Sequence, residues 1–254
     1  MPRPGDFSAQ ADAYARARPT YPVEIVDRLW ARAGLDGAEA GARIAELGAG
    51  TGLFTAHLAG RGLPVIAVEP GARMRALAPE LPGVSWRAGS FESPGLEPAS
   101  AVWIVAAQAF HWADPTRALP AMREALRPGG QFTVLWNNRD LDSPLLAHTR
   151  ALIHAMVPGF DEGYRHRDWA RVLTSTGDFE AVESDEVRHV VTMSHARFLD
   201  LWRSHNKLDI AAAAVGPTLM PAFLTAVEEH LRTQHPDPVP VHYRCLAWTA
   251  RRRG

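Results

Sequence analysis

A short apolar run that ends in three alternating glycines constrains this chain most. Residues 44–52 read IAELGAGTG, and a segment with helical character follows from Leu53. A strand that passes through a glycine turn into a helix brings backbone N–H groups and the helix N-terminus close to a ligand. The next apolar run, 64–68, ends at Glu69. An acidic side chain about 20 positions beyond the first glycine can hold ribose hydroxyls. The sequence therefore predicts a nucleoside cofactor bound between Gly48 and Glu69.

The spacing of the glycines distinguishes between two kinds of cofactor. A dinucleotide fold requires G-x-G-x-x-G, and the position of its third glycine holds Leu53 here. The carboxylate of Glu46 precedes the turn, where it would repel a pyrophosphate but suit a cofactor that carries an ammonium and a sulfonium. A turn that only connects a strand to a helix is a third interpretation, which the presence of Glu69 disfavours. A sulfonium cofactor is favoured over a nicotinamide dinucleotide.

The E-x-G-x-G-x-G pattern resembles the first motif of the class I S-adenosylmethionine (SAM) dependent methyltransferases. Other stretches resemble the small-molecule, trans-aconitate methyltransferase type of that family, and they are residues 7–14, 18–22, 106–112, 126–130 and 136–140. The resemblance covers nearly the whole chain and weakens after about Asp140. It implies SAM as cofactor, S-adenosylhomocysteine as product, and O- or N-methylation of a small molecule, with a carboxylate or hydroxyl acceptor favoured.

Short apolar runs that alternate with helical stretches predict an α/β fold with helices on both faces of a parallel sheet. Strands are expected at 43–48, 64–69, 84–88, 100–107, 131–137, 187–193 and 241–249. Helices are expected at 10–17, 22–33, 52–60, 71–78, 115–126, 143–156, 164–174, 194–208 and 219–232. The resemblance implies a Rossmann-like, seven-stranded, mostly parallel sheet with the strand order 3-2-1-4-5-7-6.

We interpret residues 1–254 as a single methyltransferase-like domain, because this length can bury one full core. The resemblance implies that residues 1–22 form an N-terminal lid segment over the cofactor. Two helical insertions, 143–174 and 194–232, flank the sixth strand. We expect them to form a cap at the carboxyl ends of the strands, where open α/β sheets bind ligands.

Composition limits the remaining classes of partner. The formal net charge of −1 disfavours broad attraction to nucleic acid or to an anionic membrane. The single cysteine excludes an internal disulfide, and the eleven scattered histidines show no metal-binding spacing, so no metal is predicted. No apolar stretch approaches the ~20 residues of a membrane span, and no signal peptide is recognisable. A cytoplasmic protein with a small-molecule substrate is expected, and its oligomeric state is left open.

The resemblance assigns the centre of the cofactor site to four residues. Gly48 and Gly50 are expected to pass close under the methionine part of SAM, with Glu46 beside its ammonium. Glu69 is expected to accept both ribose hydroxyls, because one carboxylate offers two oxygens to a vicinal diol.

The other expected cofactor residues surround this centre. They are Met74 beside the adenine, Ser90 and Phe91 after the third strand, Gln108 after the fourth strand, and Tyr14 and Arg18 in the lid segment. Many relatives carry an aspartate where this chain has Ser90. A buried core side chain is the alternative for Met74, and a surface ion pair is the alternative for Arg18.

The acceptor site is less well defined by the sequence. His111 follows the fourth strand and is a candidate general base. However, the FHW triplet around it recurs in the resembling family with different substrates, which favours a structural role or one in shaping the cavity. Arg139 is a candidate clamp for a carboxylate, with an ion pair to a neighbouring aspartate as the alternative. The remaining candidate substrate contacts are Tyr21, Trp136, Asn137 and His205.

Two alternatives to methyl transfer stay open at this point. An enzyme with the same pocket can use the sulfonium for another reaction, and a protein with the same pocket can bind SAM without catalysis. The complete set of motifs and the expected cap favour catalysis.

Overall fold

Seven strands form one sheet in the computed structural model, which describes residues 18–39, 41–161 and 163–254. The strands are β1 (Ile44–Leu47), β2 (Val65–Val68), β3 (Val84–Arg87), β4 (Ala101–Ala107), β5 (Leu126–Arg139), β6 (Phe179–Met193) and β7 (Val239–Arg252). Their order is β3-β2-β1-β4-β5-β7-β6, which confirms the predicted topology. The described residues divide into two compact units. We call 20–137, 167–187 and 245–254 the sheet unit, and 18–19, 138–166 and 188–244 the helical unit.

Parallel pairing centres on β1. Ile44 lies opposite Val65 of β2 and Trp103 of β4, and β2–β3 and β4–β5 are parallel as well. Every residue of β1 and β2 is buried. Strands that are covered on both faces consist of nearly continuous apolar residues, which is why these short runs could be found in the sequence.

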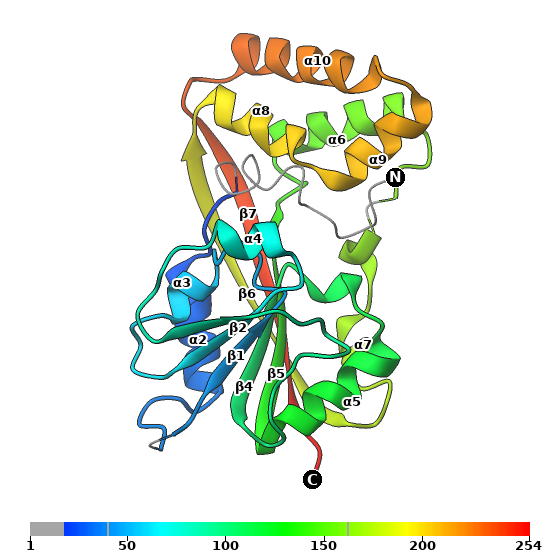
Figure 1. Cartoon of the computed structure of the whole chain (residues 1–254). Helices are drawn as coiled ribbons and strands as arrows, with labels where there is room; N and C mark the ends of the chain where they lie inside the picture. Colours follow the sequence, from blue (N-terminus) through cyan, green and yellow to red (C-terminus); the bar gives the residue numbers. More distant parts are fainter. Residues whose placement is uncertain (1–17, 40, 162) are drawn as a thin grey trace. The chain divides into compact units, whose positions relative to one another are not determined.

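Helices cover both faces of the sheet within the sheet unit. They are α2 (Val23–Arg32), α3 (Thr55–Leu58), α4 (Ala72–Ala76), the 3₁₀ turn η1 (Phe110–Trp112), α5 (Pro115–Ala125) and α7 (Trp169–Leu173). Figure 1 shows α2 and α3 on one face and α5 and α7 on the other. The carboxylate of Asp114 caps α5 by accepting from the N–H of Thr116, and Asp168 caps α7 in the same way.

Helix α5 ends before the turn residues that follow it in the sequence. It ends at Ala125, and β5 already begins at Leu126, so the Pro128-Gly129-Gly130 triplet lies inside the strand. Leu126 has extended backbone angles and pairs with Ala101. The pairing register then shifts between Ala101 and Trp103, and such an irregularity accommodates turn residues inside a strand.

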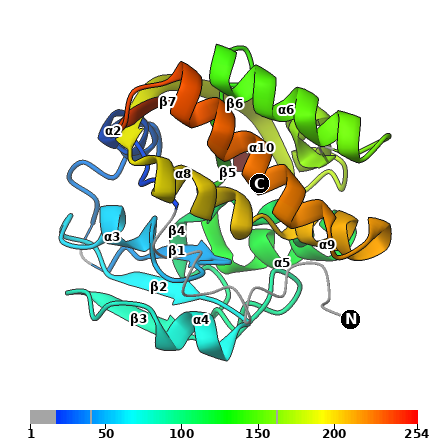
Figure 2. The ribbon, with the colours of Figure 1, turned by 90° about the horizontal axis from the view of Figure 1, so that it is seen from above.

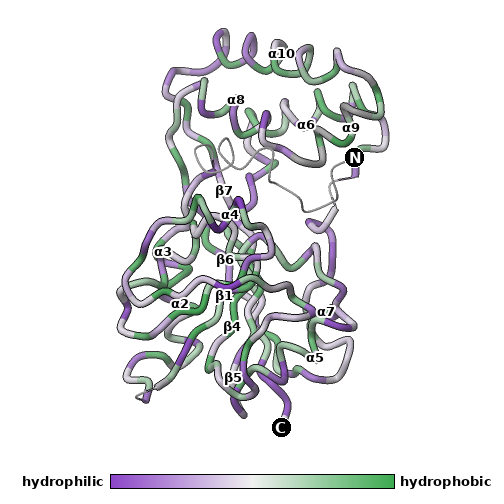
Figure 3. Tube along the Cα trace, in the orientation of Figure 1, coloured by the Kyte–Doolittle hydropathy of each residue, from purple (hydrophilic) through white to green (hydrophobic). Residues whose placement is uncertain are grey.

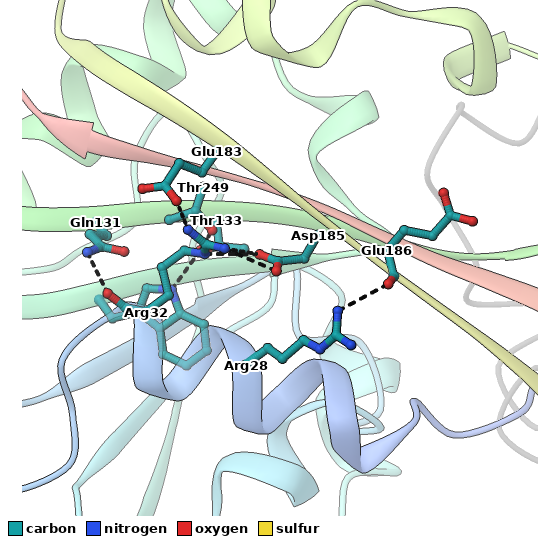
Figure 4. A network of polar contacts seen from close by, with 9 residues as sticks. Arg28, Arg32, Gln131, Thr133, Glu183, Asp185, Glu186 and Thr249 are labelled. Carbon is teal, nitrogen blue, oxygen red and sulfur yellow. Dashed lines mark hydrogen bonds and ion pairs between the residues drawn. The ribbon is translucent and has the colours of Figure 1, made fainter.

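A polar network joins α2 to the sheet (Figure 4). The guanidinium of Arg32 donates to both oxygens of Asp185 on β6, at 3.0 and 3.1 Å, and also contacts Glu183. Gln131 of β5 donates to the backbone oxygen of Arg32 at 2.9 Å. Ion pairs with two donors from one planar guanidinium fix orientation as well as distance. The network therefore holds α2 in one register against β6.

The helical unit contains the remaining helices. They are α6 (Pro144–Met156), the 3₁₀ turn η2 (Gly163–His166), α8 (His195–Arg203), α9 (Asn206–Val215) and α10 (Leu219–Gln234). Helix α10 packs against α6 and α8 and lies between them in Figure 2. Phe223 and Leu231 of α10 are fully buried with Phe198 of α8. Figure 3 shows hydrophobic and hydrophilic residues mixed along α10, as expected of a helix with one buried face.

Two expected helices are divided in the structure. The stretch 164–174 forms η2 and α7, which are separated by the cap residue Asp168, and 194–208 forms α8 and the start of α9. The expected helix 10–17 and most of the lid segment 1–22 lie outside the described residues. The single-domain organisation with cap insertions 143–174 and 194–232 stays a prediction. In the part of the chain that the structure describes, no helix has the length and apolar character needed to cross a bilayer.

Candidate functional site

A left-handed glycine turn follows β1 and forms the base of the candidate site. Gly48, Gly50 and Gly52 have φ values of 68°, 59° and 85°, which favour glycine. A Cβ atom at position 48 would lie 2.5 Å from the Cβ of Ala109 and 3.3 Å from the ring of Phe91. No such atom fits without a shift of the neighbouring chain. Position 48 therefore requires glycine, both for its left-handed φ and for the close approach of Ala109.

Glu69 is fixed at the end of β2 by this same turn. Its carboxylate accepts from the N–H of Gly50 at 2.9 Å and from the N–H of Gly71 at 2.7 Å. Burial raises the pKa of Glu69, and the two backbone donors oppose that rise. Each carboxylate oxygen has a second lone pair. Glu69 is thus held in place and can still accept hydrogen bonds from a ligand diol.

Glu46 is the most deeply buried carboxylate of the site, with 1% of its surface exposed. The hydroxyl of Thr55 donates to it at 2.6 Å. Burial raises its pKa to about 8, and the nearby charge of Glu69 adds to the rise. Among the described residues, no cationic side chain pairs with Glu46. A ligand cation would therefore stabilise the ionised form of this side chain. Sequence reasoning did not identify Thr55, which reaches Glu46 only through the fold.

Apolar side chains flank the glycine turn. Met74 is buried, and its Cε lies 3.6 Å from the position of a Cβ at residue 50. Phe91 is buried beside position 48 and packs edge-to-face on Phe110. Both predicted residues therefore lie at the turn, where they can form the wall of a pocket.

The hydroxyl of Ser90 is engaged within its own loop. It donates to Glu92 at 2.9 Å and accepts from the N–H of Ser93 at 3.2 Å. Glu92 also accepts from the N–H of Asp114 at 3.0 Å, and its pKa is lowered because these hydrogen bonds outweigh partial burial. Glu92 is thus the acidic group of this loop. Sequence reasoning missed it, although its place two positions after Ser90 was a usable signal.

Gln108 links the carboxyl ends of β4 and β5. Its φ of 56° is unusual for a residue with a side chain. Its amide donates to the backbone oxygen of Asn137 at 3.0 Å, and its N–H donates to the oxygen of Leu135 at 2.8 Å. Strained backbone of this kind persists where the surroundings fix it, often at ligand sites.

His111 is oriented by a buried tryptophan. The indole N–H of Trp136 donates to Nδ1 of His111 at 3.2 Å. Nδ1 is therefore an acceptor, which assigns the hydrogen of the neutral ring to Nε2. Trp136 stacks on Trp169 with ring centroids 4.1 Å apart and is 1% exposed. In this arrangement Trp136 positions His111, and its role as a substrate contact stays a prediction.

Two further predicted substrate contacts also lie inside the sheet unit. Asn137 is buried, and its amide donates to the backbone oxygen of Thr20 at 3.1 Å. Tyr21 is buried and packs edge-to-face on Phe54 at 4.9 Å. Asn137 thus fastens the segment before α2 to β5, and Tyr21 packs that segment against the residue that precedes α3; their roles as substrate contacts stay predictions.

The other predicted residues lie in the helical unit or outside the described residues. The guanidinium of Arg139 lies 3.8 Å from the ring centre of Trp202, and His205 stacks on the same ring. The backbone oxygen of Arg18 accepts from Arg197 at 3.3 Å. Tyr14 lies outside the described residues. The predicted site therefore divides. The expected cofactor residues from Glu46 to Gln108 belong to the sheet unit, while Arg18, also an expected cofactor residue, belongs to the helical unit with Arg139 and His205.

Comparison with known families identifies the part of the chain that contains the glycine turn. A family model described as a methyltransferase domain matches residues 45–134. Residues 45–134 form a methyltransferase domain. This methyltransferase domain contains the glycine turn, Glu69 and His111, and all these residues belong to the sheet unit.

Curated relatives extend this finding over about half of the chain. An uncharacterized methyltransferase of Mycobacterium bovis, like one of Mycobacterium tuberculosis, is 41% identical over 135 residues, which is 53% of this chain and 53% of the relative. An uncharacterized methyltransferase-like protein of Schizosaccharomyces pombe is 35% identical over 136 residues, 53% of this chain and 52% of the relative. The chain thus spans about half the length of the curated relatives it matches.

Solved structures share the fold of the methyltransferase domain and the rest of the chain. One is a protein of Anaeromyxobacter dehalogenans that is described provisionally as a type II methyltransferase. It is 23% identical to this chain with a TM-score of 0.70, and the match covers 92% of this chain and 97% of that one. Another is a phosphoethanolamine N-methyltransferase of Haemonchus contortus in complex with SAM. It is 16% identical to this chain with a TM-score of 0.53, and the match covers 97% of this chain and 57% of that one. At these identities the likeness establishes the class I methyltransferase fold. The trans-aconitate branch stays a prediction.

Proposed function

We propose that this chain is a SAM-dependent methyltransferase that methylates an oxygen or nitrogen of a small molecule. One observation carries the proposal. Glu46 is buried without a cationic partner among the described residues, and Glu69 accepts from the N–H of Gly50; both lie beside a glycine turn whose position 48 leaves no room for a Cβ. This pair of acidic acceptors fits an adenosyl sulfonium with its ammonium and ribose diol, and not a pyrophosphate. The complex of the Haemonchus contortus enzyme with SAM supports the choice of cofactor.

Within this proposal each residue of the turn has a separate task. SAM supplies a methyl group that is bound to a positively charged sulfur. The carboxylate of Glu46 would hold the ammonium, and Glu69 would accept the ribose hydroxyls while the N–H groups of Gly50 and Gly71 keep it in place. Positioning of this kind lowers the barrier because the donor and acceptor atoms already lie in line.

The tautomer of His111 bears on how the acceptor is activated. Because Nδ1 accepts from Trp136, the ring presents an N–H and not a lone pair at Nε2. A donor can orient an acceptor but cannot remove its proton. An acceptor that arrives already ionised, such as a carboxylate, needs no general base. The arrangement therefore favours positioning over base catalysis, and His111 as a base becomes the less favoured role.

Binding of S-adenosylhomocysteine tests the assigned pocket. Glu69→Ala removes an acceptor of charge-assisted hydrogen bonds, so isothermal calorimetry is expected to show affinity weakened by about tenfold or more. Glu24→Ala is the matched control, because Glu24 is an exposed carboxylate that pairs with Arg28 on α2. Unchanged affinity in Glu69→Ala would place the cofactor elsewhere.

Product analysis separates methyl transfer from the alternatives. With SAM and a metabolite panel, mass spectrometry is expected to detect S-adenosylhomocysteine and a methylated product. Methylthioadenosine as the main product would indicate other sulfonium chemistry, and bound SAM without turnover would indicate a non-catalytic protein. The proposal includes a cytoplasmic location and the lack of nucleic-acid and membrane partners. The formal net charge of −1 supports the lack of these partners.

A further inference from the structure

The helical unit gathers positive charge around one buried arginine. Arg139, at the end of β5, is 8% exposed, and its guanidinium lies over the ring of Trp202 at 3.8 Å. The side chain of Arg165 donates to the backbone oxygen of Arg139 at 3.4 Å. The charges of Arg165 and Arg18 act on Arg139 and, with burial as the main cause, lower its pKa to about 9. Arg139 is therefore still cationic at neutral pH.

No anion balances this charge in the described part of the chain. The carboxylate of Asp140, next in sequence, pairs with Arg188 at 3.7 Å instead. Neither Arg139 nor Arg165 forms an ion pair with any described residue. A buried charge without a partner is costly, and buried arginines are ordinarily paired. Stacking on Trp202 covers one face of the guanidinium, but it leaves the N–H donors in the ring plane available to an acceptor.

Neutral donors lie in the same cluster. Tyr243 of β7 is 3% exposed, and its hydroxyl has no hydrogen-bond partner among the described residues. Burial raises the pKa of Tyr243, so the hydroxyl keeps its proton. Nδ1 of His205 accepts from the N–H of Leu208 at 3.3 Å, which leaves the hydrogen of the neutral ring on Nε2. Burial, together with the charges of Arg139, Arg18 and Arg165, lowers the pKa of His205 well below its usual value and keeps the ring neutral.

We propose that the helical unit binds a small organic anion, whose oxyanion group is held by Arg139 and Arg165 with a hydrogen bond from the hydroxyl of Tyr243. A planar guanidinium matches a carboxylate or a phosphate with two parallel donors. The shared chemistry is a compact oxyanion. That this anion is part of the methyl acceptor rests on the proposed function; the binding site itself does not.

Calorimetry with the full-length protein tests the site with matched probes. Succinate and inorganic phosphate are titrated at constant ionic strength, and succinamide serves as the uncharged counterpart of succinate. Binding of succinate or phosphate without binding of succinamide is expected, and the tighter of the two anions identifies the source as carboxylate or phosphate. Equal binding of succinate and succinamide, or binding of neither anion, would overturn the proposal.

Variants locate the binding. Arg139→Met is expected to weaken anion binding by about thirtyfold or more, because it removes one partner of a buried charge-assisted contact. Tyr243→Phe keeps the ring and is expected to weaken binding by about tenfold. Arg203→Met is the matched control, since Arg203 is exposed on α8 and pairs with Asp200. Circular dichroism confirms folding, and if Arg139→Met does not fold, the result for Tyr243→Phe decides. Anion binding that is unchanged in Tyr243→Phe and, where it folds, in Arg139→Met would overturn the assignment.

The same samples are titrated with S-adenosylhomocysteine, so that the two proposals fail separately. Cofactor binding without anion binding would overturn the anion site and leave the proposed function intact. Anion binding without cofactor binding or methyl transfer would overturn the proposed function and leave the anion site intact. Anion binding with methylation only of compounds that lack an oxyanion would refute its role in the acceptor.

Discussion

At the scale of single residues, the two carboxylates of the glycine turn differ in what holds them. Glu69 accepts two backbone N–H bonds that oppose the effect of burial on its pKa. Glu46 has only the hydroxyl of Thr55, and burial raises its pKa to about 8. Glu46 is therefore the group whose ionisation depends most on a bound cation.

The raised pKa of Glu46 predicts a pH-dependent stability of the ligand-free protein. The folded state binds this proton more tightly than the unfolded chain, so the stabilisation is complete below about pH 4.5 and is lost as pH rises towards about 8. The free energy of unfolding is expected to fall across this window, with one proton giving at most about 1.4 kcal/mol per pH unit. Urea unfolding at pH 5, 6, 7 and 8 measures it.

The comparison variant is Glu46→Gln, whose amide oxygen still accepts from Thr55. This variant is expected to show a shallower pH profile and to be more stable than the parent at pH 8. It is also expected to bind S-adenosylhomocysteine more weakly, because the ligand ammonium loses its carboxylate. Parallel pH profiles for parent and variant would show that Glu46 does not titrate as described.

At the scale of elements, the side chain of Arg32 contributes more than that of Arg28 to holding α2 against β6. Arg32 donates twice to Asp185, whose side chain is 10% exposed. Arg28, one turn earlier, is half exposed and pairs with Glu24 on its own helix; its one bond to β6 is a long one, 3.4 Å, to the backbone oxygen of Glu186. Exposed pairs within a helix contribute little, while charge-assisted bonds in partly buried positions contribute more. The position of α2 should therefore depend on Arg32.

Substitution of these two arginines tests that difference. Arg32→Met is expected to lower the free energy of unfolding by about 1.5–3 kcal/mol, because it leaves the carboxylate of Asp185 without its partner. Arg28→Met is expected to change it by less than about 0.5 kcal/mol. Chemical denaturation of both variants supplies the measurement. Equal effects from the two substitutions would contradict the unequal roles of the two side chains.

At the scale of the whole molecule, the proposed cofactor residues around the glycine turn and the arginine cluster around Arg139 belong to different compact units. Glu46, Glu69 and the glycine turn lie in the sheet unit, and Arg139 and Tyr243 lie in the helical unit. A ligand that binds the folded state stabilises the structure that it contacts, and exchange of backbone amides reports where. The two proposed ligands should therefore leave different protection patterns.

Hydrogen exchange with mass spectrometry distinguishes those patterns. S-adenosylhomocysteine is expected to slow exchange in peptides that contain residues 44–52 and 69–74. Succinate or phosphate, whichever binds, is expected to slow exchange in peptides around 138–141 and 164–166. Arg203→Met should retain both effects, and Arg139→Met should lose the second. If the anion slows exchange in residues 44–52 and not in residues 138–141 and 164–166, the oxyanion site does not lie in the helical unit.

The glycine turn and the acidic residue of the candidate cofactor site were predictable because their signals are local. A left-handed turn needs glycine wherever it occurs, and an acidic residue at the end of the next parallel strand has a fixed place beside that turn. The strand order came from the family resemblance. Apolar runs that alternate with helical stretches indicate a parallel sheet, but they do not indicate the order of its strands. The residues 90–92 show the limit of such reasoning: Ser90 was singled out, but the acidic group of its loop is Glu92.

The sequence by itself determined the glycine turn, the two carboxylates around it and the succession of strands and helices, since each of these depends on neighbours along the chain. Only the tertiary structure decided which partners these groups find. Thr55 reaches Glu46, Trp136 sets the tautomer of His111, and Arg139 lies over Trp202 apart from any described carboxylate. The physical reason is that ionisation and hydrogen bonding depend on burial and on contacts between distant segments, which no local pattern encodes.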